Sequence, residues 1–280
     1  MADTSASGAP VRLLTWNVEG ARQKHARRQA EWLAASPYDL MVLTGVDAPD
    51  GELLQALTEE GLHVLASPLS AASASDRDEH VVVAARHHRP SRLDVPPPRE
   101  QPHRCLATRL ESSSAETDLV LAGVHVPGRG GRSRRLRDKR DFRHAGRVWL
   151  PRVLAAAGER PLIVAGDLFL VEPGEDPRCA ELAPWECDFY WSWGRMGLTD
   201  VYRAVHPRQV DPAPRWFGVD QPREHRAGQI WMSGFRPGAA EGCHYDETVC
   251  AERLSTRPAL IATLNLLDPA VENDLRLAQA

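Results

Sequence analysis

The chain has 280 residues, of which 42% are hydrophobic and 26% are charged, proportions typical of a globular protein rather than a disordered one. Its formal charge of −4 excludes a strongly basic nucleic-acid-binding protein as a whole. No apolar run approaches the roughly 20 residues that span a bilayer, so we expect no membrane insertion. Five cysteines at scattered spacings form no disulfide framework, which predicts a reducing, cytoplasmic location.

The first part of the chain alternates short apolar runs with amphipathic stretches. Residues 1–10 are expected to form a disordered tail. We predict strands at residues 11–18, 39–46, 63–69 and 79–86, helices at 21–35 and 51–60, and a loop at 70–79. Prolines make residues 87–103 either a connection or edge structure. Residues 105–112 and 118–127 are expected to pair as a hairpin.

The remainder of the chain begins with an arginine-rich loop. We then predict a helix at 142–157, a strand at 161–171, an irregular tryptophan-rich segment at 172–195, a short helix at 198–207, strands at 215–219, 229–235 and 257–267, and a tail at 268–280. Too many adjacent strands lack a crossover helix for a simple doubly wound sheet. The pattern therefore predicts one α/β domain over 11–267, with two mixed sheets face to face and helices outside both.

Six short motifs follow one another along the chain: WNVEG, LTGVD, GVHVPG, AGDLF, GLTDVYRAVHP and QIWMSG. Their order and spacing resemble the endonuclease/exonuclease/phosphatase superfamily, particularly its exonuclease III and apurinic-endonuclease branch. The resemblance runs from Val11 to Leu264, nearly the whole chain. It implies a four-layer α/β/β/α sandwich and the Mg²⁺-dependent cleavage of phosphoesters.

Several positions of the family's site are retained, as the resemblance implies. Asn17 matches the asparagine near the metal and phosphate, and Glu19 stands where that branch often has Asp or Asn. His125 occupies a position for a phosphate-contacting His or Tyr, and Asp167 is the acid of the GDxN motif. Asn17, His125 and Asp167 are thus the candidate catalytic residues. If a metal binds, Glu19 and Asp167 are its candidate ligands, since Mg²⁺ prefers oxygen donors.

Other family positions have lost their chemistry. Gly45 stands where the principal metal-binding glutamate follows an apolar strand, and Phe169 replaces the asparagine of GDxN. Trp231 takes the place of an acid. Thr256 and Arg257 stand where the family has an Asp-His pair. Because catalytic groups of this kind act together, such losses predict that the family mechanism no longer operates.

Three functions follow as hypotheses. The first is a catalytically degenerate protein that binds a ligand or partner and needs no cofactor. The second is an active phosphodiesterase whose Mg²⁺ or Mn²⁺ is held by Glu19, Asp167 and a further acid such as Asp47 or Asp246. The third is a metal-free enzyme on a small organic substrate, built on Asp167, His125 and Arg257.

The pocket implied by the family's fold changes character in this sequence. Arg257 would point into it and form an ion pair with Asp167, because a buried carboxylate needs a partner. Aromatic residues would form an apolar wall for a small organic ligand. The candidate ligand-binding residues are therefore Arg257, Trp231, Phe169, Trp191 and Trp193. The alternative for the tryptophan-rich segment is core packing beneath a long loop.

Basic residues gather in one stretch of this acidic protein. Nine of them lie between Arg129 and Arg147, against two acids. They predict a polyanion-binding patch or, alternatively, a solvated helix face. The candidate residues of the patch are Arg132, Arg134, Arg135 and Arg137. The partners expected are a small molecule or a phosphate-bearing ligand, with nucleic acid as an alternative. The oligomeric state stays open.

Overall fold

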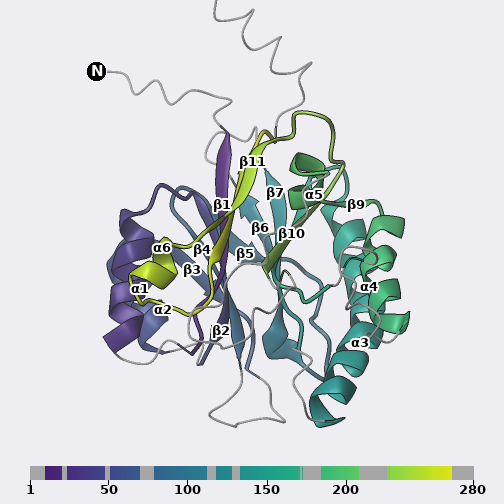
Figure 1. The fold of residues 1–280 in the computed structure, drawn as a ribbon, viewed down its shortest axis with the longest axis horizontal. Helices are drawn as coiled ribbons and strands as arrows, with labels where there is room; N and C mark the ends of the chain where they lie inside the picture. Colours follow the sequence, from purple (N-terminus) through teal and green to yellow (C-terminus); the bar gives the residue numbers. More distant parts are fainter. Residues whose placement is uncertain are drawn as a thin grey trace, which may run out of the picture.

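The computed structural model describes residues 10–20, 24–47, 51–69, 79–111, 118–127, 133–170, 172, 184–207, 226 and 228–266. Two sheets of six strands each form its centre (Figure 1). The first sheet has the order β11-β12-β1-β2-β4-β3 and comprises β1 (Val11–Asn17), β2 (Leu40–Val46), β3 (His63–Ala66), β4 (His80–Ala85), β11 (Ala240–Asp246) and β12 (Ala259–Leu264). The second has the order β5-β6-β7-β8-β10-β9 and comprises β5 (Arg89–Arg92), β6 (Cys105–Glu111), β7 (Leu119–His125), β8 (Leu162–Asp167), β9 (Leu198–Asp200) and β10 (Gly228–Ser233).

Each sheet is mixed, because one parallel pair lies among antiparallel neighbours. β1 runs parallel to β2 in the first sheet, and β7 runs parallel to β8 in the second. Asn17 is the last residue of β1 and Asp167 is the last residue of β8. These two residues contact each other, so the carboxyl ends of all four parallel strands lie at one end of the molecule.

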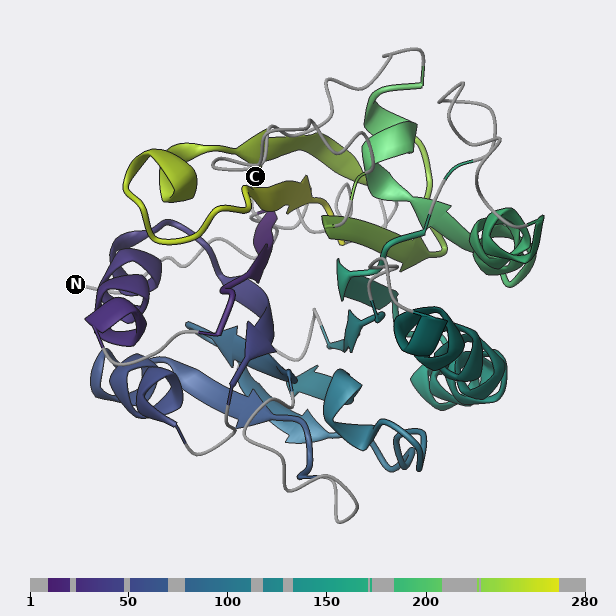
Figure 2. The same cartoon turned by 60° about the horizontal axis from the view of Figure 1, so that its bottom comes forward.

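Helices cover the outer face of each sheet and complete four layers (Figure 2). The first sheet is covered by α1 (Lys24–Ala35), α2 (Glu52–Glu59) and the short α6 (Thr248–Ala251). The second is covered by α3 (Ser133–Ala157) and α4 (Pro184–Arg195). Two short elements complete the chain: α5 (Val201–Val205), which contacts β9, β10 and β11, and the 3-10 turn η1 (Pro102–Arg104). The predicted two-sheet sandwich is confirmed.

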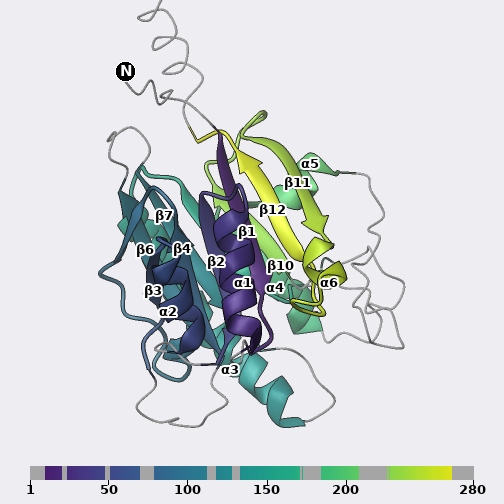
Figure 3. The ribbon, with the colours of Figure 1, turned by 90° about the vertical axis from the view of Figure 1, so that its left-hand side faces the viewer.

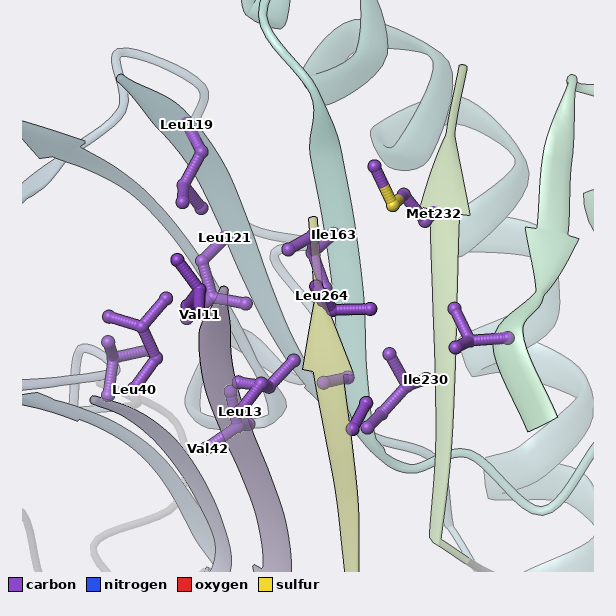
Figure 4. Close-up of a cluster of buried hydrophobic side chains, with 14 of the residues drawn as sticks. Val11, Leu13, Leu40, Val42, Leu119, Leu121, Ile163, Ile230, Met232 and Leu264 are labelled. Carbon is purple, nitrogen blue, oxygen red and sulfur yellow. The ribbon is translucent and has the colours of Figure 1, made fainter. Parts of the chain in front are cut away.

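Side chains alternate between the two faces of each strand, and this alternation separates three cores. Leu13 of β1 and Ile230 of β10 face the space between the sheets (Figure 4). Their neighbours Leu14 and Trp231 face the helices instead. Burying a leucine or isoleucine side chain contributes about 1.5–3 kcal/mol. The inner core thus holds the sheets together and fixes where their ends meet.

The segment 184–195 was predicted to be irregular, and this prediction is wrong because the segment forms α4. Phe189, Tyr190 and Trp193 follow one another at helical spacing and are all buried against the second sheet. The many tryptophans suggested an irregular segment, although the buried residues follow the spacing of an amphipathic helix. The observed helix also places the exposed Trp191 on the side of α4 away from the core.

Three further boundaries differ from the predictions. Helix α3 begins at Ser133, because charged residues of the expected loop lie on a helix that ion-pairs with α4. Residues 198–207 divide into β9 and α5 instead of forming one helix. The edge strand β11 was not predicted, since it alternates with exposed polar residues such as Glu241 and His244. The predicted strand at 215–219, the loop at 70–78 and most of both tails lie outside the described residues.

Within the ranges that the structure describes, no helix combines the length and apolarity needed to cross a membrane.

Candidate functional site

The ends of β1 and β8 bring two retained family positions together. Because side chains alternate along a strand, Asn17 faces the same side of β1 as Leu13, and Asp167 the same side of β8 as Ile163. The Nδ2 atom of Asn17 donates a hydrogen bond to Oδ2 of Asp167 at 2.5 Å. Both residues are buried. This bond links the two sheets at the end of the inner core.

Asn17 also shapes the turn after β1. Its Oδ1 atom accepts a hydrogen bond from the backbone N–H of Glu19 at 3.0 Å. Glu19 has a φ of 54°, a left-handed conformation that this side-chain bond helps to stabilise. The turn directs the Glu19 carboxylate to the segment before β12. There the backbone N–H and the hydroxyl of Thr256 each donate to it at 2.7 Å.

Arg257 lies between the two carboxylates of the site. Its Nη1 atom is 2.5 Å from Oδ2 of Asp167, and its Nε atom is 3.3 Å from Oε1 of Glu19. The guanidinium also lies over the ring of Phe169, 5.8 Å from the centroid. The indole N–H of Trp16 donates to the Arg257 carbonyl at 3.1 Å. The ion pair with Asp167 predicted from the sequence is therefore present, and a second carboxylate joins it.

The electrostatics of Asp167 follow from this arrangement. Burial raises the pKa of the Asp167 carboxyl, because the charged form loses its hydration. The Arg257 charge and the hydrogen bond from Asn17 act in the opposite direction and lower this pKa, although burial is the larger effect. Arg257 thus stabilises the carboxylate form of a buried acid.

Gly45, where the resemblance leads us to expect a metal-binding glutamate, has a backbone that favours glycine. Its φ is +68°, and a β-carbon added there would lie 2.4 Å from Oδ1 of Asn17. The Asn17 amide therefore fills the space in which a side chain at position 45 would begin. The backbone N–H of Gly20 donates to the Gly45 carbonyl at 2.7 Å, which holds the two turns together.

Of the two proposed replacement acids, Asp246 lies away from the site and Asp47 lies beside the turn that carries Glu19. Asp246 accepts hydrogen bonds from the backbone and hydroxyl of Thr248 at the start of α6, and from the Tyr38 hydroxyl at 3.3 Å. Its neighbour across the strands, Ala259, packs against the helices. Asp246 is therefore on the outer face of the first sheet. Asp47 lies beside the turn after β1, where its carboxylate oxygen would be 2.6 Å from a β-carbon added at Gly20.

The residues present do not fit a Mg²⁺ ion. Across the described ranges, no three His, Cys, Asp or Glu side chains are grouped so that they could hold a metal. The carboxylates of Glu19 and Asp167 are already bound by Arg257, Thr256 and Asn17. A guanidinium thus occupies the place between two acids where a cation would be needed.

His125 ends β7 directly beside Asp167 in the parallel register. It is buried, and its Nε2 atom lies 3.7 Å from the Glu79 carboxylate. Among the described residues its buried Nδ1 atom has no hydrogen-bond partner. Burial first, and then the charges of Arg104 and Arg257, hold the pKa of His125 well below 6.5, so the imidazole is neutral at neutral pH.

The structure does not bring the predicted aromatic wall together. Phe169 lies at the site, with a left-handed φ of 46°. Trp231 and Trp193 are instead buried beneath the outer helices, with ring centroids 5.6 Å apart. Trp231 also donates to Oε1 of Gln229 at 3.3 Å. These two tryptophans face away from the inner core that ends at Asp167.

The predicted arginine patch is only partly described. Arg132 and the side chains of Arg134 and Arg135 lie outside the described residues, whereas Arg137 is exposed on α3. Lys139, from the same stretch, is buried. Its ammonium donates to Oε1 of Glu186 at 3.1 Å and to the Phe169 carbonyl at 3.2 Å. It therefore connects α3 and α4 to the backbone beside the site.

Sequence reasoning also missed a buried ionic group in the second sheet. The guanidinium of Arg226 donates to both carboxylate oxygens of Asp200, at 3.2 and 2.7 Å, and the Tyr190 hydroxyl donates to the same carboxylate at 3.2 Å. Asp200 lies within the GLTD motif, which was used only to recognise the fold. A buried acid at the end of an apolar strand is a signal that a cationic partner must exist.

Comparisons with known proteins agree with this architecture. No protein-family model matches the sequence, and no curated protein matches it. Among solved structures, a 3′-5′ exonuclease, NExo from Neisseria meningitidis, is 21% identical, with 91% of this chain and 100% of that chain covered and a TM-score of 0.73. The AP endonuclease LMAP from Leishmania major is 19% identical, with coverages of 92% and 88% and a TM-score of 0.73. A Neisseria 3′ phosphatase bound to a product DNA hairpin is 21% identical, with coverages of 91% and 99% and a TM-score of 0.71.

The chain therefore has the fold of exonuclease III and the AP endonucleases, which is that of the endonuclease/exonuclease/phosphatase superfamily. The fold that this resemblance implied is confirmed. At these identities the likeness concerns the fold, and the chemistry of the site rests on the residues described above.

Proposed function

We propose that this chain is a catalytically degenerate protein of the endonuclease/exonuclease/phosphatase fold, which binds a phosphate-bearing ligand without cleaving it. The observation that carries the proposal is the position of Arg257, whose guanidinium contacts both Glu19 and Asp167. One of the two carboxylate charges that a divalent cation would neutralise is already balanced by the chain itself. Hydrolysis with Mg²⁺ needs an ion that polarises the phosphoryl group.

The ligand class follows from the groups at the same end of the sandwich. Arg104 donates to the His125 carbonyl at 3.3 Å and contacts Glu79, so a second guanidinium lies near the neutral imidazole. Guanidinium groups and an imidazole nitrogen are suited to phosphate oxygens. A neighbour in fold is bound to a DNA hairpin, which supports a phosphate-bearing ligand here.

The alternative, an active phosphodiesterase with relocated ligands, requires carboxylates that converge. Asp246 lies on the outer face of the first sheet, and Glu19 is bound by Thr256 and Arg257. The metal-free alternative requires Asp167 or His125 to move a proton to a substrate. Since Arg257 and Asn17 hold Asp167 from two sides, binding is the better supported function.

The proposal is tested by calorimetric titration of Mg²⁺ and Mn²⁺ into the purified protein, with Asp167→Asn as the matched variant. A DNA hairpin with a 3′ phosphate is incubated in parallel with each metal. We expect no saturable binding up to about 10 mM metal, well above the range of ordinary protein sites, and an intact hairpin. Saturable metal binding that disappears in Asp167→Asn, together with cleavage, would overturn the proposal.

A further inference from the structure

Helix α3 presents basic side chains on one stripe of its surface. Arg137, Arg140, His144 and Arg147 are exposed and follow the spacing of three and four residues that places side chains on one helix face. Asp141 is the exposed acid within the same span. The stripe extends over eleven residues, from Arg137 to Arg147, which is about 15 Å of helix. An excess of positive charge on this face is unusual in a chain with a formal charge of −4.

Part of the positive charge is paired with an acid where α3 meets α4. Arg143 and Arg195 both bond the carboxylate of Asp188, the second at 2.7 Å. The hydrogen bond from Arg195, and then the charges of Arg143 and Arg147, lower the pKa of the Asp188 carboxyl. Three guanidiniums therefore converge on one acid, and the local charge remains positive.

Aromatic rings lie within the same surface. Arg140 and Arg143 lie over the ring of Trp185, at 5.6 and 5.7 Å from its centroid. Trp191 comes one helical turn after Asp188 and one turn before Arg195, and its side chain is 49% exposed. An exposed indole beside guanidinium groups is the combination on which an unstacked base can lie.

The start of α3 lies beside the candidate site. Lys139 bonds the carbonyl of Phe169, whose ring contacts Arg257. Gln101, just before η1, donates to the Asp138 carbonyl at 3.1 Å, which fixes the same end of the helix. In Figure 3 this end of α3 emerges below the ends of β1 and β2. The basic stripe thus begins at the rim of the site and runs along the outer layer.

We propose that this α3–α4 basic surface, formed by Arg137, Arg140, His144, Arg147, Trp191 and Arg195, binds single-stranded nucleic acid. The inference rests on the proposed function, because it extends a phosphate-bearing ligand from the site onto the helices. The stripe is about 15 Å long, so its guanidiniums can contact more than one phosphate of the same strand. The guanidiniums bind phosphates, and Trp191 stacks on a base. Double-stranded nucleic acid is an outcome of the test.

The test is fluorescence anisotropy with a labelled oligothymidylate of about 15 nucleotides, in EDTA, across about 50 to 200 mM salt. The triple variant R137Q/R140Q/R147Q removes three charges of the surface and leaves the buried Lys139 and Arg143 in place. We expect its affinity to fall at least about tenfold at low salt. The magnitude of the slope of log K against log salt should decrease by about 2, because each of the three lost single-strand contacts contributes about 0.7.

A matched triple variant, R89Q/R99Q/R152Q, changes the net charge equally at exposed arginines outside the surface. We expect its affinity to change less than about threefold, because long-range electrostatics are screened at these salt concentrations. Trp191→Ala is expected to weaken oligothymidylate binding about fivefold and to leave binding of a duplex of equal length unchanged. Equal losses of affinity in both triple variants, or no measurable binding by the wild type, would overturn the proposal that this surface binds nucleic acid. Tighter duplex binding with no effect of Trp191→Ala would overturn the assignment to single strands.

The experiment distinguishes a failure of the proposed function from a failure of the α3–α4 basic surface. Cleavage of the oligonucleotide after Mg²⁺ is added would overturn the non-hydrolytic role, yet leave the binding measured in EDTA intact. Intact oligonucleotide with no dependence on the three arginines would overturn the surface alone.

Discussion

Asn17 and Gly45 fit together because Gly45 has no side chain. A β-carbon at Gly45 would lie 2.4 Å from the Oδ1 atom of Asn17, and the φ of Gly45 is +68°. The amide that bonds Asp167 therefore takes up the space where a metal-binding side chain would start. The side chain that links the two sheets is thus the one that leaves no room for a side chain at position 45.

A first prediction compares two glycines with left-handed backbones. Gly61 has a φ of +84°, but a β-carbon added there would meet nothing within 4 Å, so Gly61→Ala introduces backbone strain alone. We expect Gly61→Ala to cost about 1 kcal/mol and Gly45→Ala about 2–4 kcal/mol, since overpacking adds to the strain. Urea unfolding measures both. Equal losses would show that Asn17 moves aside without cost.

A second prediction concerns Arg257→Gln, which leaves Asp167 buried without its cation. We expect a loss of about 2–4 kcal/mol near neutral pH, because breaking a partly buried pair strands one charge. Without Arg257 the pKa of Asp167 rises further, so the folded state favours the protonated acid. The loss should therefore shrink as the pH falls from about 7 to about 4.5. Urea unfolding at both pH values tests this. On the Asp167→Asn background, where no carboxyl titrates at position 167, the loss caused by Arg257→Gln should change much less with pH.

The histidine at the site gives a third prediction. The folded-state pKa of His125 lies well below 6.5, so the unfolded chain binds its proton at higher pH than the folded protein. Stability is thus lost as the pH falls through about 6.5 towards the folded-state value. We expect His125→Gln to reduce this dependence and the exposed His144→Gln to retain it. Denaturant unfolding between about pH 7.5 and 5 measures the free energy of unfolding of both variants. The same dependence of this free energy on pH in both variants would contradict the prediction.

A fourth prediction separates the two kinds of tryptophan. Trp231 is buried among Tyr190 and Trp193, whereas Trp191 is 49% exposed. We expect Trp231→Ala to cost about 3–5 kcal/mol and Trp191→Ala less than about 1 kcal/mol in the free energy of unfolding. A small loss at Trp231 would indicate space beneath α4 and would revive the aromatic ligand pocket.

Much of the fold could be predicted because its central strands are short, continuous apolar runs. The runs that became β1, β2, β4, β7 and β8 are almost continuously buried, and motifs lie at the ends of β1, β2, β7 and β8. Helix α4 was missed because Trp185, Trp191 and Trp193 suggested irregular structure before their helical spacing was considered. Strand β11 was missed because an edge strand with one covered face has no apolar run.

The site could be predicted in part. The pairing of Asp167 with Arg257 followed from the need of a buried acid for a cation. The contact of Arg257 with Glu19 could not, because it depends on the left-handed turn at Glu19, which sequence does not reveal. The position of Trp231 required the register of β10, in which a shift of one residue moves every side chain to the other face.

Arg257 also changes how the end of the sandwich depends on its surroundings. A site filled by a diffusible ion gains stability only in proportion to RT ln(1 + [ion]/Kd), so chelation weakens it. Arg257 is attached to the chain, and its charge reaches Glu19 of one sheet and Asp167 of the other at any concentration of free cation. If the proposed function holds, we expect the stability of the junction between the two sheets to be unchanged by a chelator, because Arg257 is present in every copy of the chain.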